Sequence, residues 1–372
     1  MSLLALQEYW WIIISLLGAL LVFLLFVQGG QTLIYSLGKT EIEKTMLINS
    51  MGRKWEFTFT TLVVFGGGFF ASFPLFYATS FGGAYWVWMI ILFAFIVQAV
   101  SYEYRTKPNN FLGQKTYELF LWINGLIATV FLGTAVSTFF TGSYFYIDDM
   151  NRVLWMGQAR GLEAVLNPMN IALGLAIFFL SRTLALLYFQ NDIDDEAILK
   201  RSRRQLWGNA VPFLVLFLIW FGWLLFVKGF AYDPVSKEVF LEKGKYWHNL
   251  LDMPLNSIIF VGGLILILYG LFISMVKEST KGIWFTGTGT VLTVFALFIL
   301  AGFNNTCFYP SAYDLQSSLT IENASSSHYT LTAMSYVSLM VPFVLAYIWY
   351  AWKSISSKKI DAEEMNGETH TY

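Results

Sequence analysis

One acidic side chain stands at the mouth of a long apolar stretch, where it is placed to do proton chemistry. Glu56 directly follows Trp55, and residues 57–102 contain no Asp, Glu, Lys or Arg. Ionisable residues in or beside membrane-spanning segments are candidates for function by default. Such a carboxylate could take a proton from water and pass it inward, or it could interact with the N-terminal dipole of its own helix. The residues alone leave both interpretations of Glu56 open.

Four other ionisable residues lie in or beside apolar runs. Glu103 and Arg105, in "VSYEYRTK", are expected to form a local ion pair that anchors a helix end. Glu118, in "QKTYELFLW", opens a run at a position where a carboxylate suits the helix N-terminus, so we expect a structural role. Arg182, in "IFFLSRTLALLYF", either extends to the membrane surface or pairs with a carboxylate of a neighbouring helix or partner subunit.

Three consecutive glycines follow Glu56 in the same run. Gly66, Gly67 and Gly68 are followed by the small residues Ala71 and Ser72. Small residues allow helices in a membrane to approach each other closely. We therefore expect this stretch to pack at an interface between helices.

Residues that could bind a metal or a haem are missing from the apolar runs. His248, His328 and His370 all fall outside these runs, and Cys307 is the only cysteine. A haem iron needs an axial His, Met or Cys thiolate, and a Met near a helix end is far more often a packing residue. We therefore expect no metal site, no cofactor ligated by this chain, and no catalytic residue of its own.

The composition is typical of a membrane protein. Hydrophobic residues make up 56% of the chain and charged residues only 13%, against about 25% charged in soluble domains. The net charge of −1 argues against nucleic acid as a partner. A spanning helix needs about 20 apolar residues, and these runs lack the alternation of a β-barrel strand. We expect an all-α integral membrane protein with about nine transmembrane helices, at 9–37, 57–79, 83–101, 117–140, 164–189, 207–228, 257–276, 283–303 and 333–352.

Most Lys and Arg residues lie in the first, third, fifth and seventh connections and in the C-terminal segment. Because cytoplasmic connections carry the excess of positive charge, we expect the N-terminus outside and the C-terminus inside. The expected units are a first four-helix bundle, an outside loop, a second four-helix bundle containing the outside loop 229–256, an ordered outside cap, a ninth helix and a cytoplasmic tail. Their ranges are 1–140, 141–163, 164–303, 304–332, 333–353 and 354–372.

Four segments of the chain resemble subunit II of the cytochrome bd quinol oxidases, and the resemblance covers essentially the whole length. The segments are "LINSMGRKWEFTFTTLVVFGGGFFASFPLFYATSF", "VSYEYRTK", "VLNPMNIALGL" and "YPSAYDLQSSLTIENASSSHYTLTAMSYVSLMVPFVLAYIWYAW". The last resembles the C-terminal signature of the family almost residue by residue. One departure is the family's Asp-Gly-x-Asp stretch near the end of the first helix, where this chain has Gln28, Gly29, Gly30 and Gln31. A proton or cation role of those carboxylates therefore does not carry over.

The resemblance implies a bacterial inner-membrane complex that reduces O2 to water with electrons from quinol. Two b-type haems and haem d would belong to the partner, subunit I, and this chain would be its non-catalytic partner. Trp55 and Glu56 match the family's Trp-acid pair, whose carboxylate lies in a cytoplasmic proton path. Small single-helix subunits, membrane lipid, and a structural quinone or lipid within this subunit are further partners that the resemblance leaves open.

Two other classes of function remain alternatives on the residues alone. A secondary transporter usually has discontinuous helices with charges near the membrane midplane, and these runs are almost free of charge there. A purely structural membrane scaffold would have no proton role. Haem absorbance in a complex with a larger, His-bearing partner would indicate the oxidase, and a colourless homo-oligomer would indicate a transporter.

Overall fold

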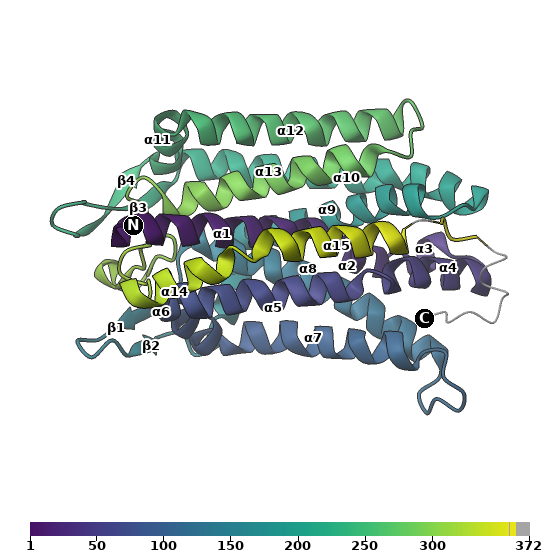
Figure 1. The fold of residues 1–372 in the computed structure, drawn as a ribbon, viewed down its shortest axis with the longest axis horizontal. Coiled ribbons are helices and arrows are strands. Elements are labelled where there is room, and N and C mark those ends of the chain that lie inside the picture. Colours follow the sequence, from purple (N-terminus) through teal and green to yellow (C-terminus); the bar gives the residue numbers. More distant parts are fainter. Residues whose placement is uncertain (357, 362–372) are drawn as a thin grey trace.

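The computed structural model describes residues 1–356 and 358–361, so most of the expected tail 354–372 lies outside the described residues. Long helices run side by side along the long axis of the molecule (Figure 1). Seven helical segments are long and apolar enough to cross a membrane. They are α1 with α2 (Leu3–Gln31), α7 (Tyr85–Tyr104), α8 (Gln114–Thr141), α9 (Pro168–Asp192), α10 (Glu196–Phe226), α12 (Pro254–Met275) and α13 (Gly282–Gly302). The protein is therefore a multi-pass, mainly helical membrane protein.

The two remaining apolar runs form interrupted helices. The second run holds α5 (Trp55–Ser72), which ends where Pro74 begins the short α6 (Pro74–Tyr77). The last run holds α14 (His328–Ser338) and α15 (Val341–Ile355), which are bent by 42° relative to each other and count as an eighth crossing if taken together. The expected number of nine crossings and their orientation stay predictions.

Short elements connect the helices at both ends of the bundle. One end of the bundle carries the connections rich in Lys and Arg, and we call it the basic end. It contains α3 (Ile34–Leu37) and α4 (Glu41–Gly52), near the C-terminal end of α15 (Figure 1). Thr40 caps α4: its hydroxyl accepts a hydrogen bond from the Glu43 amide, and the Glu43 carboxylate accepts one from the Thr40 amide, at 3.1 Å. This reciprocal pair fixes the first turn of α4.

The opposite end, the hairpin end, is covered by polar structure. Its elements are β1 (Phe145–Ile147), β2 (Val153–Trp155), η2 (Leu162–Leu166), β3 (Lys228–Tyr232), β4 (Val239–Lys243), α11 (Lys245–Asp252) and η3 (Leu315–Ser317). β1 pairs with β2 and β3 with β4, both antiparallel. The indole of Trp155 donates a hydrogen bond of 2.9 Å to the carbonyl of Thr79, in the π-helix η1 (Ala78–Gly83). The β1–β2 hairpin is thereby joined to the membrane-spanning part.

α9 lies at the centre of the bundle, packed against α2, α8 and α10, while α1 packs against α13. The expected first and second bundles therefore share helix contacts through α8 with α9 and α1 with α13. Gly29 in α2 sits so close to α9 that a Cβ atom there would lie 2.2 Å from the carbonyl oxygen of Ser181. Only glycine permits this approach.

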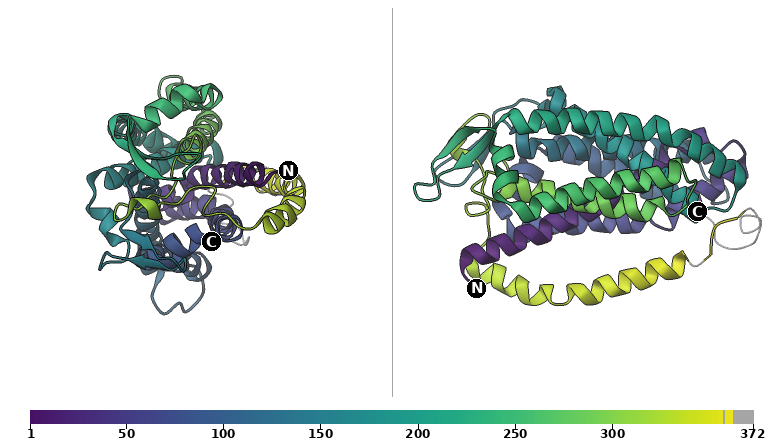
Figure 2. Two further views of the ribbon diagram at one scale, coloured as in Figure 1. Left: turned by 90° about the vertical axis from the view of Figure 1, so that its left-hand side faces the viewer. Right: turned by 90° about the horizontal axis from the view of Figure 1, so that it is seen from above.

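α15 differs from the other long helices because it stands beside the bundle (Figure 2). Every residue from 341 to 350 is exposed in the isolated chain. At the hairpin end, α14 is attached to α1 by hydrogen bonds from the Trp10 indole to the Leu331 carbonyl and the Ser335 hydroxyl, both 3.2 Å. At the basic end, Trp352 contacts the rings of Phe26 and Phe57. The α14–α15 segment is therefore attached to the bundle at its two ends, and the residues between these attachments are exposed.

The close contact of α2 with α9 predicts an unequal response to two Gly→Ala changes. Gly29→Ala should destabilise the purified protein by about 1–3 kcal/mol, because its Cβ collides with the backbone of α9. Gly262→Ala is the control, since nothing lies within 4 Å of its Cβ position, and it should be neutral or slightly stabilising. Thermal unfolding midpoints in detergent measure the difference. Equal midpoints would contradict the packing described for Gly29.

Candidate functional site

Glu56 lies in the first turn of α5 and points outward at the basic end of the bundle. Its side chain is exposed, and within the described part of the chain it forms no hydrogen bond or ion pair. The residue before the helix, Lys54, provides no side-chain cap either. The exposed residues of α5 recur with helical spacing on one side, which we call the outward face of α5: Glu56, Thr60, Val63, Val64, Gly67 and Phe70. Glu56 is the single charged residue of this face.

Trp55 connects Glu56 to a buried polar cluster. Its indole stacks on the ring of Tyr102 with centroids 5.8 Å apart and planes 15° apart. The Tyr102 hydroxyl accepts a hydrogen bond of 3.1 Å from the amide of Gln31. Both Gln31 and Gln28 donate to the side-chain oxygen of Gln98, at 2.9 Å and 2.7 Å. Trp55 therefore packs against a network that joins α2 to α7.

The three amides Gln28, Gln31 and Gln98, which we call the glutamine cluster, are fully buried. A primary amide neither gains nor loses a proton in the physiological range, so the cluster holds no titratable group. It can hold helices together, but it cannot pass protons by changing its own protonation state.

The expected pair of Glu103 with Arg105 is wrong. Arg105 instead binds Glu118 of α8, with a shortest N–O distance of 2.9 Å, and both side chains are only 1% exposed. Glu103 points to solvent and pairs with Lys107 at 3.1 Å. The reason is helical geometry: Arg105 shares the inward face of α7 with Gln98 and Tyr102, whereas Glu103 lies on the outer side.

Glu118 has a larger role than the dipole interaction expected for the start of α8. Its carboxylate accepts hydrogen bonds from two nitrogens of Arg105, at 2.9 Å and 3.2 Å, and Lys44 approaches it to 3.8 Å. A buried carboxylate and guanidinium are stable together only because each compensates the other. This buried pair therefore joins the end of α7 to the start of α8 at the basic end.

Lys54 is a second buried charge that the sequence pattern did not indicate. Its side chain is 1% exposed, and its ammonium lies 4.3 Å from the centroid of the Trp352 ring in α15. Among the described residues no acceptor forms a hydrogen bond with this ammonium. Burial lowers the pKa of Lys54 to about 8, although the nearby carboxylate of Asp192 opposes that shift. The cation therefore holds the end of α15 through the face of an aromatic ring.

Asp192, at the end of α9, is a further residue that the sequence did not single out. Its carboxylate accepts a hydrogen bond of 2.5 Å from the Ser50 hydroxyl. Its backbone carbonyl accepts one of 2.9 Å from the amide of Ile360, which is fully buried. The described part of the C-terminal segment is thereby attached to α9 beside Lys54.

Arg182 lies within α9 and is held by neutral partners in the described residues. Its guanidinium donates to the side-chain oxygen of Asn209 at 2.6 Å and to the Thr32 hydroxyl at 3.0 Å, and it lies over the Phe178 ring. Within the described residues, Arg182 therefore does not form an ion pair with a carboxylate of a neighbouring helix. The arginine instead connects α9 to α10 and to the end of α2.

The three glycines of α5 face different surroundings. A Cβ at Gly68 would lie 2.6 Å from Ile14 of α1, so this glycine serves packing inside the chain. A Cβ at Gly66 would make an ordinary contact with Phe81 at 3.5 Å. Gly67 has nothing within 4 Å and belongs to the outward face of α5. Of the three, Gly67 alone is placed to admit a helix from outside the chain.

Within the described residues, no His or Cys side chain lies inside the seven long spanning helices. His248 lies in α11 at the hairpin end, where its ring is 2.6 Å from the Glu242 carboxylate. His328 lies at the start of α14, and His370 is outside the described residues. Cys307 is buried at the hairpin end, where burial raises the pKa of its thiol to about 12. No group of three or more His, Cys, Asp or Glu side chains is arranged for a metal within residues 1–356 and 358–361.

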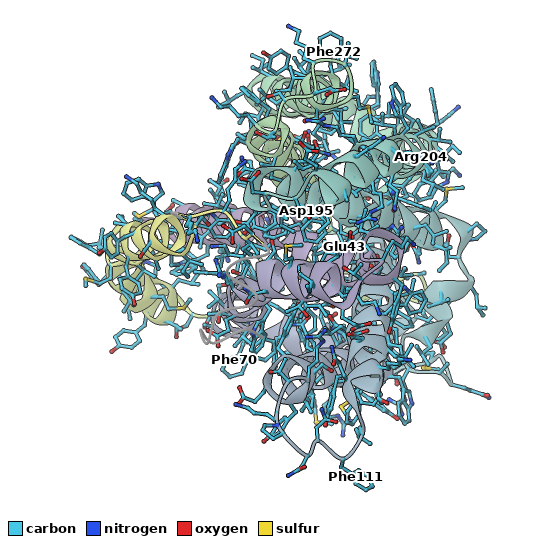
Figure 3. The ribbon with its side chains drawn as sticks, turned by 90° about the vertical axis from the view of Figure 1, so that its right-hand side faces the viewer. Glu43, Phe70, Phe111, Asp195, Arg204 and Phe272 are labelled. Carbon is cyan, nitrogen blue, oxygen red and sulfur yellow. The ribbon has the colours of Figure 1, made fainter. Side chains whose placement is uncertain are left out.

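Figure 3 looks onto the basic end. Glu43 and Asp195 lie near the middle of this view, and Phe111 marks the tip of the loop between α7 and α8. Glu43 pairs with Arg201 of α10 at 2.5 Å. The basic end thus contains several ion pairs that connect helices, and Glu56 takes part in none of them.

The buried pair predicts that two glutamates of the same region respond differently to removal of their charge. Glu118→Gln should destabilise the purified protein by about 3–5 kcal/mol, because it removes the carboxylate that binds the buried guanidinium of Arg105. Glu103→Gln breaks an exposed pair and should cost about 1 kcal/mol or less. Thermal unfolding in detergent compares the two variants. If Glu118→Gln unfolds at the same temperature as Glu103→Gln, the burial of this pair is not what stabilises the α7–α8 contact.

The chain matches the family model described as cytochrome bd terminal oxidase subunit II over residues 6–355. It is 26% identical to cytochrome bd-I ubiquinol oxidase subunit 2 of Escherichia coli (strain K12), with 98% of each chain covered. It is 28% identical to cytochrome bd ubiquinol oxidase subunit 2 of Bacillus subtilis (strain 168), covering 93% of this chain and 94% of the relative. The fold is similar to a chain of the bd oxidase from Geobacillus thermodenitrificans, with a TM-score of 0.61, 12% identity, and coverage of 94% and 97%.

Proposed function

Because the chain belongs to the cytochrome bd terminal oxidase subunit II family, we propose that it is the subunit without haem ligands in a bacterial inner-membrane complex that reduces O2 to water with electrons from quinol. In this proposal the two b-type haems and haem d are bound by the partner, subunit I. The location of His248, His328 and Cys307 outside the seven long spanning helices supports it. The chain supplies no catalytic residue; it supports the haem subunit and contributes to proton uptake.

The surface that would meet the haem subunit includes the outward face of α5. Between α5 and α7 runs an apolar groove of ≈ 510 Å³, lined among others by Val63, Gly67, Phe70 and Leu92. Large apolar side chains of α7 and α15 are exposed in the isolated chain. A helix partner is favoured here because Thr60 and Gly67 are small, which permits close approach of a second helix.

Glu56 is the residue we propose for proton uptake, and its position on the outward face of α5 carries the proposal. It stands at the basic end of an otherwise uncharged face, has no partner within the described chain, and would lie at the rim of the contact with the haem subunit. The excess of Lys and Arg at this end favours a cytoplasmic location. A carboxylate there meets water on one side and the subunit contact on the other. Trp55, stacked on Tyr102, fixes the start of the helix that presents it.

The competing explanation is that Glu56 only stabilises the start of α5, and it predicts a smaller effect of mutation. Loss of a cap or dipole interaction costs about 0.5–2 kcal/mol, which is too little to abolish activity in a large complex. Loss of a proton donor and acceptor should instead slow turnover by about 10²-fold or more. The two explanations therefore differ in what they predict for activity at unchanged haem content.

Glu56→Gln should assemble with its full haem spectrum and lose most of its quinol-driven O2 consumption, because Gln keeps the shape of the side chain but cannot be protonated or deprotonated. Glu56→Asp should retain part of the activity, since Asp titrates but is one methylene shorter. Turnover and the haem absorbance of the purified complex are measured on the same preparation.

Glu103→Gln is the matched control, because Glu103 is another exposed carboxylate at the basic end and should tolerate the change. If Glu56→Gln turns over at the wild-type rate, Glu56 has no role in proton uptake and only stabilises the start of α5. Loss of haem in the same variant would make it a residue of assembly.

The proposed subunit contact predicts that a bulky residue at Gly67 impairs assembly. Gly67→Leu should lower the yield of the two-subunit complex while this subunit remains folded, because the new side chain projects from the outward face of α5. Gly208→Leu provides the control, since Gly208 is also exposed, with nothing within 4 Å, but lies on α10. Co-purification of the two subunits and haem content are the measurements. Equal yields from both variants would exclude Gly67 from the contact.

A further inference from the structure

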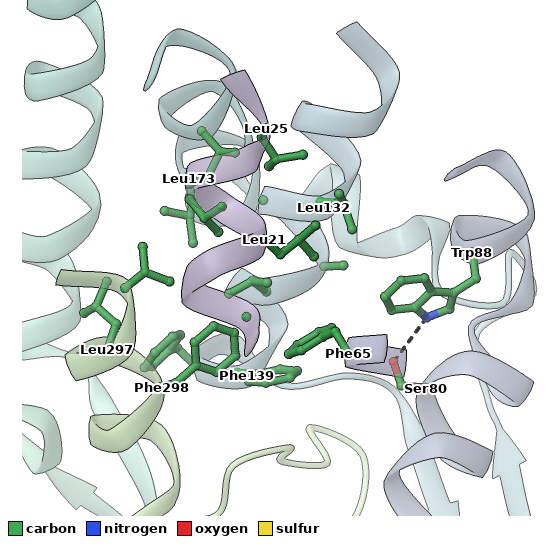
Figure 4. A pocket seen from close by; sticks show the side chains of 18 of the residues that line it. Leu21, Leu25, Phe65, Ser80, Trp88, Leu132, Phe139, Leu173, Leu297 and Phe298 are labelled. Atoms are coloured by element: carbon green, nitrogen blue, oxygen red, sulfur yellow. Dashed lines mark hydrogen bonds between the residues drawn. The ribbon is translucent and has the colours of Figure 1, made fainter. Parts of the chain in front are cut away.

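An internal cavity lies among the helices of this subunit, separate from the residues that surround Glu56 (Figure 4). It has a volume of ≈ 70 Å³ and is lined by residues of α1, α5, α6, η1, α7, α8, α9, α10 and α13. Its walls are formed by Gly, Ala, Val, Leu, Ile, Phe and Trp side chains, with Ser80 as the single residue bearing a hydroxyl. No charged side chain lines it.

The polar groups in the wall already have partners. The Trp88 indole donates a hydrogen bond of 3.3 Å to the Ser80 hydroxyl, and the Trp220 indole donates one of 3.0 Å to Ser137. None of the lining side chains leaves a buried nitrogen or oxygen atom without a partner in the described chain. A buried water molecule needs two to four hydrogen-bond partners, and the wall of this cavity has no unpaired polar group to provide them.

Interlocked aromatic rings prevent the cavity from closing. Phe298 makes edge-to-face contacts with Phe65 and Phe139, with centroids 6.0 Å and 5.7 Å apart. Rings packed in this way cannot move into the empty volume without losing their contacts with one another. An apolar cavity that stays empty is a binding site for small apolar molecules, as engineered cavities of this kind bind xenon.

A route to the cavity leads through two stacked rings. Phe81 and Trp88 line both the cavity and the apolar groove between α5 and α7. Their centroids are 3.8 Å apart, and the other face of Phe81 lies against Tyr77 at 4.9 Å. Phe81 belongs to η1 and is followed by Gly82, around which there is open space. Rotation of the Phe81 side chain would connect the groove to the cavity.

We propose that this cavity binds a single small apolar molecule, and that in the working complex this molecule is dioxygen. The choice of dioxygen rests on the proposed function, in which it is the one small apolar substrate. The cavity itself, its apolar wall and its access past Phe81 do not depend on that function. The cavity is a side chamber of this subunit and takes no part in the chemistry at the haems.

Xenon is the probe, because it is apolar, of similar size to dioxygen and visible in diffraction by its electron density. Crystals of the complete complex under xenon pressure should show one xenon atom between Leu21, Leu132 and Phe298. Raising the oxygen pressure at constant xenon pressure should lower the xenon occupancy, because both gases compete for the same volume. Neither measurement requires turnover, so failure of the oxidase assays and failure of this experiment are distinguishable.

Ala135→Leu should fill the cavity and lower xenon occupancy at least fivefold, because Ala135 lies in its wall. Ala99→Leu makes the same change in α7 outside the wall and should leave the occupancy unchanged. If Ala135→Leu does not assemble, Val22→Leu adds only one methylene to the wall and should lower the occupancy by a smaller factor. Phe81→Ala should keep the occupancy and shorten the time needed to reach it.

Three results would overturn the proposal. The first is wild-type crystals with xenon at other apolar sites but none in this cavity. The second is an acyl chain, quinone ring or ordered water filling the cavity. The third is xenon occupancy that is the same in Ala135→Leu as in Ala99→Leu. Xenon binding that added oxygen does not displace would retain a site for apolar gases and exclude dioxygen as its ligand.

Discussion

Hydrocarbon offers no hydrogen-bond partners, and this constraint governs where the chain can place every polar group between its two ends. Backbone groups find their partners within helices, and buried side chains must find them within the protein. Arg182 meets the requirement through Asn209 and Thr32, and the side-chain nitrogen of Gln28 meets it through the side-chain oxygen of Gln98. The helices can approach closely enough for these bonds because glycine stands at contacts such as that of Gly29 with α9. Polar pairing and tight packing therefore depend on each other.

Charged side chains stand at both ends of the bundle, and those of the basic end fall into two kinds. The pairs Arg105–Glu118 and Glu43–Arg201 form the first kind: each charge is paired with another within the subunit, and each pair connects two helices. Glu56 is of the other kind, since it lies on the outward face of α5 and has no partner in the described chain. A residue of this second kind is available to water and to another subunit. This difference in surroundings, more than the type of residue, separates the proposed proton-uptake residue from its structural neighbours.

Much of the fold could be predicted from the sequence, because apolar runs of membrane length have few alternatives to helices. The π-helix at 78–83 could not, because it depends on tertiary contacts such as that of Trp155 with Thr79. The bend between α14 and α15 lies at Pro342, near the start of α15, so the sequence did carry a signal for that break. In the site, the position of Trp55 and Glu56 at the start of a helix followed from the pattern. The predicted Glu103–Arg105 pair was wrong because these two residues are close in sequence but lie on different faces of α7.

A signal for the correct partner of Arg105 was present in the sequence. Gln98, Ser101, Tyr102 and Arg105 recur at intervals of three and four residues in an otherwise apolar helix, which indicates a polar inward face. Lys54 and Asp192 carried no such signal. They are brought together by the contact of α4 with α9, and residues so far apart in the chain show no pattern in a single sequence.

The glutamine cluster has an electrical consequence. A carboxylate at the position of Gln28 or Gln31 would carry charge within the membrane, where the transmembrane potential acts on it with about 2.3 kcal/mol per elementary charge per 100 mV for a full crossing. Three neutral amides experience no such net force. The contact of α2 with α7 should therefore keep the same geometry in a fully energised membrane and in a depolarised one, so that voltage acts on the complex elsewhere.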